Sequence, residues 1–354
     1  MSRPIRATIH LSALSHNLDV ARHHATHARV LAVIKANGYG HGMLRVARAL
    51  AAADGFAVLN VQEAVTLREA GFTQEILLLE GFFTADELPL LTQHRIATVV
   101  HAQWQIDALL RFSSAVNIPL WLKANSGMNR LGFQASEFPA ALDALQHAGA
   151  TPTLMTHFAR ADESEGIAGQ LTCFNAISRH AELPRSMANS AALLSYPQTH
   201  ADWVRPGIML YGASPLPPQS AAELGLHPAM TLSSEVIALR NIKAGDEVGY
   251  GGTFQAPCDM RIGVVACGYA DGYPRHAPTG TPLLVNGQRS RVIGRVSMDM
   301  LTVDLSNIPE ANVGTPVTLW GEGMPVEDVA AAAGTISYEL LCAVAQRVPM
   351  LEAA

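Results

Sequence analysis

The chain has 354 residues, of which 49% are hydrophobic and 15% are charged, and its formal net charge is −6. This composition indicates a compact globular protein and excludes a disordered one. The mild net charge and the lack of a Lys/Arg cluster argue against binding to nucleic acid. The sequence contains no run of about 20 apolar residues, so it predicts no membrane span. The first ten residues show no apolar stretch typical of a secretory signal, so we expect a cytoplasmic protein.

Four cysteines are scattered along the chain without any C-x-x-C pair, at Cys173, Cys258, Cys267 and Cys342. Their spacing indicates reduced thiols in the core rather than a disulfide framework or a zinc site. We therefore predict no bound metal.

Short apolar runs recur through the first two thirds of the chain, separated by segments of helical period. The runs are unbroken rather than alternating, which is typical of strands buried on both faces. They cover residues 30–34, 55–60, 75–80, 96–100, 118–123, 153–158, 186–189 and 207–211. The intervening helices are expected at 43–53, 62–70, 103–112, 136–149 and 167–180. Eight such repeats predict a (β/α)8 TIM-type barrel over residues 1–225, with an open doubly wound sheet as the alternative.

The pattern changes after a proline-rich linker at residues 215–218, and turn signals become frequent. Asn286-Gly287 between apolar flanks predicts a two-residue β-hairpin. Short β-branched segments lie at 261–266, 282–285, 291–296 and 315–319, and a helix is expected at 326–333. Residues 226–354 should therefore form a mostly antiparallel β-domain, which makes the fold class α/β with an added β-domain.

The segment AVIKANGYGHG, residues 32–42, aims Lys35 out of a predicted strand into a glycine-rich loop. A phosphate-binding P-loop is excluded because its lysine follows the glycines, and the glycine spacing does not fit a dinucleotide fingerprint. Polar residues also lie at the ends of the fifth, sixth and seventh predicted strands, and Arg205 directly precedes the eighth. In a barrel the carboxyl ends of the strands form the active site. The set comprises Lys35, Lys123, His157, Asn189, Ser190 and Arg205.

A buried lysine has a lowered pKa, so its neutral amine can attack a carbonyl such as the aldehyde of pyridoxal phosphate. Ser190 and the amides at the start of its helix are suited to a phosphate group. Motif spacing alone leaves three other interpretations open. In these, Lys35 belongs to a solvated loop, Ser190 is only a helix cap, and His157 is an interior histidine without a catalytic role.

Eight motifs together resemble the alanine racemase family over nearly the whole chain. They are AVIKANGYGHG (32–42), LKANSGMNRLGF (122–133), MTHFARAD (155–162), ANSAA (188–192), VRPGIMLYG (204–212), VGYGGTF (248–254), GYADGYPR (268–275) and GRVSMDM (294–300). The resemblance implies a barrel followed by a β-domain, pyridoxal 5'-phosphate as cofactor and interconversion of L- and D-alanine. Such an isomerase supplies D-alanine for the peptidoglycan of the cell wall or feeds alanine catabolism.

The resemblance also implies a role for individual residues. Lys35 resembles the lysine that holds the cofactor aldehyde and acts as one base, and Tyr250 resembles the opposite base, which reaches in from the partner of a homodimer. The residues similar to the family's cofactor-binding set are Lys35, Tyr39, His157, Asn189, Ser190, Arg205, Gly207, Ile208 and Tyr338. Arg130 and Met298 resemble the substrate-binding residues, and Lys123 resembles a lysine that is often carbamylated. Those similar to the entrance residues are Asp162, Tyr269, Arg295 and Ile336.

These residue types suit racemisation. Two bases on opposite faces of Cα are needed, one to remove a proton and one to deliver another. Guanidinium cannot accept a proton, so Arg205 should leave the pyridine nitrogen unprotonated and the cofactor a weaker electron sink. Two positions depart from the family pattern: Asn125 stands where Asp is common, and Ser297 where Cys is common.

Two other functions fit these residues less well. An amino-acid decarboxylase of the same fold pairs the pyridine nitrogen with a carboxylate, which Arg205 argues against. A pyridoxal phosphate carrier without activity would not need a β-domain holding Tyr250 and Met298. A racemase for a larger amino acid such as serine, and the choice between a biosynthetic and a catabolic role, remain open.

Overall fold

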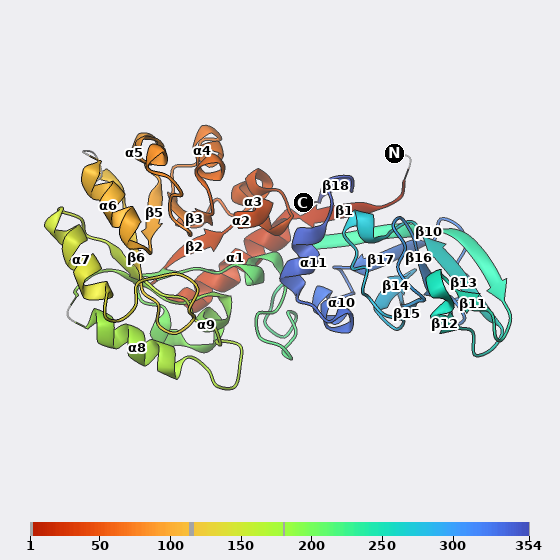
Figure 1. The fold of residues 1–354 in the computed structure, drawn as a ribbon. Coiled ribbons are helices and arrows are strands. Elements are labelled where there is room, and N and C mark those ends of the chain that lie inside the picture. The colour runs from red at the N-terminus through yellow and green to blue at the C-terminus, as the bar shows by residue number, and fades with distance from the viewer. Residues whose placement is uncertain (1–2, 113–116, 180, 354) are drawn as a thin grey trace.

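The computed structural model describes residues 3–112, 117–179 and 181–353. The chain forms two parts, a barrel and a β-domain, which lie side by side (Figure 1). The first part is the predicted barrel, in which eight parallel strands close on themselves. The inner strands are buried along their length, as their unbroken apolar runs predict. The barrel strands are β2 (Arg29–Val33), β3 (Gly55–Val58), β4 (Glu75–Leu78), β5 (Ala97–Val100), β6 (Leu120–Lys123), β7 (Thr153–Met155), β8 (Arg185–Ser186) and β9 (Trp203–Val204).

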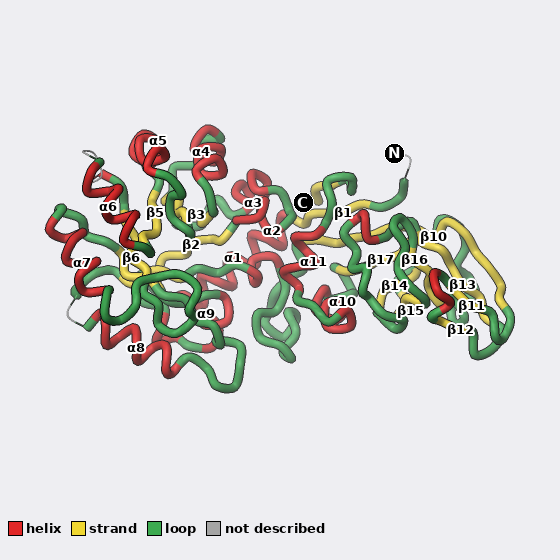
Figure 2. Tube along the Cα trace, in the orientation of Figure 1, coloured by secondary structure: helices red, strands yellow, loops and turns green. Residues whose placement is uncertain are grey.

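Helices lie on the outside of the barrel strands (Figure 2). The predicted helices are all present, with ends that differ by a few residues, and the last residue of the predicted helix 167–180 lies outside the described residues. Two helices, α1 and α5, were not predicted. The set comprises α1 (Leu11–Ala25), α3 (Met43–Ala49), α4 (Val61–Glu69), α5 (Leu88–His94), α6 (Gln103–Arg111), α7 (Phe138–His147), α8 (Ala168–Ser178) and α9 (Ser190–Ser195).

The eighth barrel strand corrects the sequence prediction. It is the two-residue β9, whereas the predicted strand at residues 207–211 is a short 3₁₀ helix, Ile208–Tyr211. The helix is fully buried, and a short buried apolar run does not distinguish a strand from a helical turn. Pro206 has no amide hydrogen, and its carbonyl oxygen instead accepts from the amide of Val33 at 2.9 Å. Arg205 therefore follows the last barrel strand instead of preceding it.

The second part is the expected β-domain, an eight-stranded sheet that is antiparallel except where β1 pairs with β18. Its order is β13-β16-β15-β14-β17-β10-β1-β18, and β13 also pairs with β10. The strands are β1 (Arg6–His10), β10 (Met230–Ile242), β13 (Met260–Val265), β14 (Pro282–Val285), β15 (Gln288–Ile293), β16 (Leu301–Asp304), β17 (Pro316–Trp320) and β18 (Met350–Ala353). A small hairpin, β11 (Glu247–Val248) and β12 (Phe254–Gln255), extends from it.

Asn286-Gly287 forms the predicted hairpin, since Val285 faces Gln288 and both turn residues have positive φ. The predicted helix is present as α10 (Val326–Ala333). The elements that were not predicted are helix α11 (Ser337–Ala343) and strands β1, β10, β11, β12, β16 and β18. Strand β10 alternates between buried and partly exposed residues over its first half, as expected when one face of a sheet packs on a core.

Strand β1 lies within residues 1–225, which the sequence assigns to the barrel, but it pairs with β10 and β18 of the sheet. The chain therefore begins in the β-domain before it enters the barrel through α1 (Figure 1). On the other side, the backbone of α11 packs against the loop after β2: a Cβ on Gly40 would lie 2.2 Å from the carbonyl oxygen of Leu341. The two parts thus share structure at their join.

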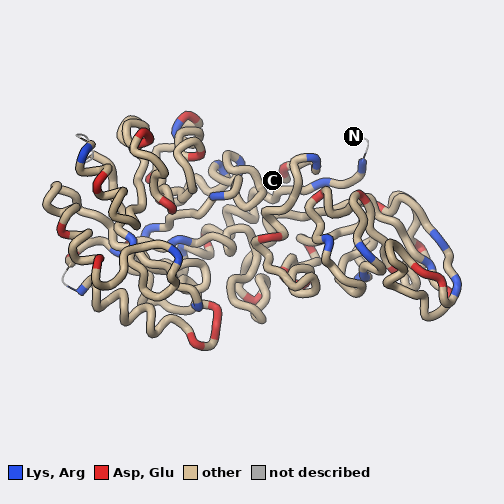
Figure 3. The backbone as a smooth tube through the Cα atoms, in the orientation of Figure 1, with Lys and Arg blue, Asp and Glu red and all other residues tan. Residues whose placement is uncertain are grey.

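All four cysteines are free, but only Cys267 is buried, while Cys258 and Cys342 are exposed. The expectation of core thiols was wrong for these two. No helix among the described residues has the length and apolar character needed to cross a membrane. Acidic and basic residues are interspersed along the backbone of both parts of the molecule (Figure 3).

Candidate active site

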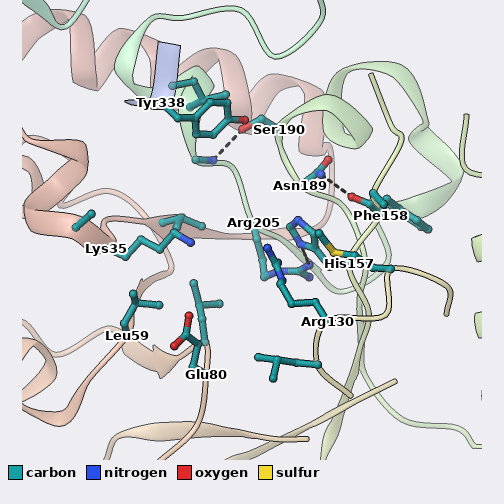
Figure 4. A pocket seen from close by; sticks show the side chains of 18 of the residues that line it. Lys35, Leu59, Glu80, Arg130, His157, Phe158, Asn189, Ser190, Arg205 and Tyr338 are labelled. Atoms are coloured by element: carbon teal, nitrogen blue, oxygen red, sulfur yellow. Dashed lines mark hydrogen bonds between the residues drawn. The ribbon is translucent and has the colours of Figure 1, made fainter. Parts of the chain in front are cut away.

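A cavity of about 850 Å³ opens at the carboxyl ends of the barrel strands, where the sequence predicts the active site. It is lined by the predicted residues Lys35, Tyr39, Lys123, Arg130, His157, Asp162, Asn189, Ser190, Arg205, Gly207, Ile208, Ile336 and Tyr338. Residues far apart in the sequence are therefore brought together as expected. Figure 4 shows Lys35, Glu80 and Arg130 pointing into the same space.

Lys35 opens an unusual turn that follows β2. The next residues adopt left-handed backbone angles, with φ of 54° at Ala36, 54° at Asn37, 64° at Gly38 and 49° at Tyr39. For residues other than glycine this conformation costs about 1–2 kcal/mol each, and such strain gathers at functional sites. The turn carries both Lys35 and Tyr39 into the cavity. The sequence predicts a glycine-rich loop after Lys35, and the structure forms this loop as a tight turn.

One side of the cavity is built from Tyr39, Asn189, Ser190 and Gly207. Asn189, not Ser190, caps α9, since its side-chain oxygen accepts from the amide of Ala192 at 3.0 Å. Ser190 instead accepts a hydrogen bond from the amide of Gly207 through Oγ at 2.8 Å. A Cβ at position 207 would lie 2.7 Å from the hydroxyl of Tyr39. Only glycine therefore leaves this hydroxyl in place.

Arg205 crosses the floor of the cavity and is 3% exposed. Its Nη1 donates to Ser186 Oγ at 2.6 Å, and its Nη2 donates to the carbonyl oxygen of Thr156 at 2.7 Å and lies 3.5 Å from Nδ1 of His157. Burial lowers the pKa of Arg205 to about 9, so the side chain stays charged at neutral pH. Burial, followed by the charge of Arg205, lowers the pKa of His157 well below its ordinary value, so His157 is neutral.

Two lysines in the cavity carry lowered pKa values. Burial and then the charge of Arg130 lower the pKa of Lys35. Burial, then Arg205 and Arg130, lower the pKa of Lys123 to about 8. Within the described part of the chain, the side chains of the two lysines and of Arg130 have no hydrogen bond and no ion pair. The cavity is therefore suited to a ligand with anionic groups.

Four predicted site residues do not line this cavity: Tyr250, Tyr269, Arg295 and Met298. They lie on neighbouring loops of the β-domain. A Cβ at Gly251 would lie 3.3 Å from the guanidinium of Arg295, and the amide of Tyr269 donates to the carbonyl oxygen of Ser297 at 3.1 Å. Tyr250 is 68% exposed and Met298 is 53% exposed. These side chains therefore lie outside the cavity lining of their own chain.

Sequence reasoning missed several lining residues, among them Leu59, Glu80, Met128, Phe158 and Cys342. Glu80 was within reach of prediction, since it ends a predicted strand as Lys123 does. The carboxylate of Glu80 raises the pKa of both lysines, in opposition to the larger effects of burial and of neighbouring cations. Cys342 comes from α11, a helix that was not predicted. Among the described residues, no three His, Cys, Asp or Glu side chains gather as metal ligands would.

The fold is a TIM-type barrel, and Lys35 at the end of its first strand faces a cavity that is rich in cations. These two features define the class of protein: a barrel that binds a small anionic ligand. Two family models extend this finding. Alanine racemase, N-terminal domain, matches residues 9–215, and Alanine racemase, C-terminal domain, matches residues 229–351. The chain belongs to the alanine racemase family, a family of isomerases.

Individual relatives are similar over nearly their whole length. An alanine racemase from Nitrosospira multiformis is 58% identical over 98% of this chain and 99% of its own. A catabolic alanine racemase from Klebsiella aerogenes is 52% identical over 99% of both chains. The crystal structure of biosynthetic alanine racemase from Pseudomonas aeruginosa superposes with a TM-score of 0.97 at 49% identity, covering 99% of this chain and 100% of that one.

Proposed function

We propose that the chain interconverts L-alanine and D-alanine with pyridoxal 5'-phosphate as cofactor, and that Lys35 and Tyr250 of the partner subunit are the two bases. The observation that carries this proposal is the Lys35 amine. It faces the cavity without an ion pair among the described residues, and burial and Arg130 lower its pKa. A neutral amine is the form that attacks an aldehyde.

The lining residues fit this cofactor. A volume of about 850 Å³ accommodates a phosphorylated pyridine ring together with a small amino acid. The Tyr39 hydroxyl beside Gly207, with Ser190, Ile208 and Tyr338 nearby, is suited to hold the phosphate. The unpaired cations supply the positive charge that the phosphate requires.

When bound, the cofactor would withdraw electrons from the Cα–H bond of the attached amino acid. Arg205 would donate a hydrogen bond to the ring nitrogen, because guanidinium has no acceptor. His157 and the carbonyl oxygen of Thr156 hold Arg205 in position for that role. We infer that this arrangement limits electron withdrawal and so suppresses transamination.

Inverting Cα requires a proton to leave one face and another to arrive at the opposite face. Lys35 serves one face from within its own chain. Tyr250 is exposed on the β-domain, outside the cavity of its own chain, which supports its delivery to the cavity of a second copy. The exposure of Met298 supports the same arrangement. We therefore infer a homodimer with two shared sites, in which each copy completes the other.

Arg130 would bind the substrate carboxylate, with the backbone at Met298 of the partner subunit making a further contact. Lys123 has a pKa lowered to about 8, which makes its amine available to react with carbon dioxide. Carbamylation would replace its positive charge by a negative one and so give Arg130 an ion partner. A ¹³C NMR signal from labelled bicarbonate that disappears in K123A would identify this group.

The remaining predicted residues, Asp162, Tyr269, Arg295 and Ile336, would line the entrance. Asp162 and Ile336 line the cavity of this chain, whereas Tyr269 and Arg295 would come from the partner subunit. Catabolic and biosynthetic relatives are similarly close, at 52% and 49% identity, so the proposal concerns the reaction and leaves its pathway open. We propose that the reaction takes place in the cytoplasm.

The proposal is tested by incubating the purified protein and pyridoxal phosphate with L-alanine in deuterated water. We expect optical rotation to decay to zero while one deuterium enters at Cα. Retention of optical rotation, or decay without deuterium, would refute the proposal. L-serine, run in parallel, measures how far the cavity admits a larger side chain.

A further inference from the structure

We propose that His41 is a positioning residue, which fixes Lys35 and Tyr39 relative to each other by holding the left-handed turn between them. The inference rests on the proposed function, because it assigns the purpose of the turn to cofactor binding. His41 is neither one of the two proposed bases nor one of the residues that line the cavity.

The turn needs support from outside its own backbone. Residues 36–40 all have positive φ, and three of them, Ala36, Asn37 and Tyr39, are not glycine. Side chains with a Cβ disfavour this conformation, so a free loop would not keep it. Lys35 begins the segment and Tyr39 lies near its end. Any relaxation of the turn would move the amine and the phenol apart.

His41 supplies that support from a fully buried position. Its Nδ1 lies 3.1 Å from the carbonyl oxygen of Gly38 and 2.8 Å from that of Tyr39. Both partners are acceptors, so Nδ1 carries the hydrogen and donates to two carbonyl groups of the turn. These contacts join the imidazole directly to the strained residues.

The other ring nitrogen fixes the charge state of His41. Its Nε2 is buried and has no hydrogen-bond partner among the described residues. A second proton would create a buried cation without an acceptor, and burial accordingly lowers the pKa of His41 to about 4. At neutral pH the ring is neutral and holds a single tautomer, which makes it a constant donor to the turn.

An aromatic column connects His41 to Tyr39 on one side of the cavity. The ring of His41 lies 4.8 Å from that of Tyr211, which stacks on Tyr39 at 4.5 Å. The Tyr211 hydroxyl donates to the carbonyl oxygen of Val33, the last residue of β2, at 3.0 Å. Behind the column, Arg45 donates to the carbonyl oxygen of His41 at 2.7 Å and to Glu352 of β18 at 2.6 Å. The turn is therefore anchored at its start, along its length and from behind.

Three substitutions separate the donor from the bulk of the ring. H41N retains an N–H donor near the position of Nδ1, H41Q moves the donor one bond further, and H41F keeps the ring without a donor. For each full-length protein, the cofactor is removed, the dissociation constant for added pyridoxal phosphate is measured, and the absorption spectrum of the bound cofactor is recorded. Hydrogen exchange of the peptide covering residues 36–42 is measured without cofactor.

We expect H41F to raise the dissociation constant for pyridoxal phosphate about tenfold or more. The loss of a buried donor to two carbonyl groups would loosen the turn that positions Lys35 and Tyr39. It should also speed exchange in the turn, and H41N should restore both values to within about threefold of the wild type. As a control, His200 is also buried and bonds a carbonyl group, that of Leu193 at 2.9 Å. H200F should leave cofactor affinity and exchange in the turn unchanged.

Wild-type affinity and exchange in folded H41F would overturn the inference, as would a lowered unfolding temperature with unchanged affinity. If H41F does not fold, the comparison of H41N with H41Q decides. Tight binding of pyridoxal phosphate by H41N with weak binding by H41Q supports the inference, and equal binding by the two variants overturns it. A wild-type protein that binds no pyridoxal phosphate would refute the proposed function, whereas the exchange measurement tests the role of His41 in the turn without any cofactor.

Discussion

Nη2 of Arg205 lies 3.5 Å from Nδ1 of His157 at the floor of the barrel cavity. Burial and then the charge of Arg205 lower the pKa of His157 well below its ordinary value, so the imidazole is neutral. The pair therefore presents one fixed positive charge to the cavity. The proposed function depends on this charge, because it decides whether a ring nitrogen placed there is protonated.

Arg205→Glu should increase transamination. A carboxylate would keep the ring nitrogen protonated and strengthen the electron sink. We expect the fraction of turnovers that yield pyruvate to rise about tenfold, equivalent to about 1.4 kcal/mol of barrier difference. Pyruvate and pyridoxamine phosphate are measured per racemisation event, with Arg205→Lys as the control that keeps the charge. An unchanged fraction in folded Arg205→Glu protein would count against the suppressing role of Arg205.

Lys35→Ala and Tyr250→Phe should each abolish racemisation, yet a mixture of the two should recover activity. If each site combines Lys35 of one chain with Tyr250 of the partner subunit, every mixed dimer has one intact site and one doubly altered site. After the subunits are unfolded and reassembled at equal amounts, we expect about a quarter of wild-type activity. No recovery in mixed dimers, isolated by two different affinity tags, would show that the two bases belong to the same chain.

Gly207→Ala should weaken cofactor binding through steric contact with Tyr39. The new Cβ would lie 2.7 Å from the Tyr39 hydroxyl and 3.4 Å from Cζ of the same ring. We expect the dissociation constant for pyridoxal phosphate to rise about tenfold, as loss of a charged hydrogen bond would cause. Gly169→Ala in α8 is the matched control, since a Cβ there meets nothing within 4 Å. Equal affinity in both variants would exclude Tyr39 from the phosphate site.

Stability without cofactor should fall in mild acid, partly through His41. Its pKa is 6.5 in the unfolded chain and about 4 in the folded protein. Below pH 6.5 the unfolded state therefore binds a proton that the folded state does not, and stability is lost progressively down to about pH 4. The full effect of this group is about 3 kcal/mol. Urea unfolding of the wild type should shift more between pH 7 and pH 5 than that of H41N, and parallel curves would contradict the burial of a neutral His41.

The barrel could be predicted from the sequence because its strands are buried on both faces and read as unbroken apolar runs. The same signal failed at residues 207–211, where a buried 3₁₀ helix is equally apolar. Strand β1 could not be assigned to its sheet, because its partners β10 and β18 lie more than 200 residues away along the chain. Local patterns carry no information about such pairings.

The site residues at strand ends were predictable for a similar reason: topology alone brings Lys35, Lys123, His157 and Arg205 to one end of the barrel. The left-handed course of the turn was not predictable, because Ala36 and Tyr39 have no preference for positive φ. Glu80 was predictable on the same ground, because it is a polar residue at the end of a predicted strand, but it was not included among the predicted site residues. Whether Tyr250 meets Lys35 depends on an arrangement of two copies, which a single chain does not contain.

The central claim is that the amine of Lys35 holds the cofactor. Borohydride reduction of the purified protein with pyridoxal phosphate, followed by peptide mass spectrometry, tests it most directly. We predict one pyridoxyl group per chain on the peptide containing Lys35, and neither label nor racemisation in Lys35→Ala. Label on Lys123 in place of Lys35, or racemisation that survives the Lys35→Ala substitution, would contradict the account.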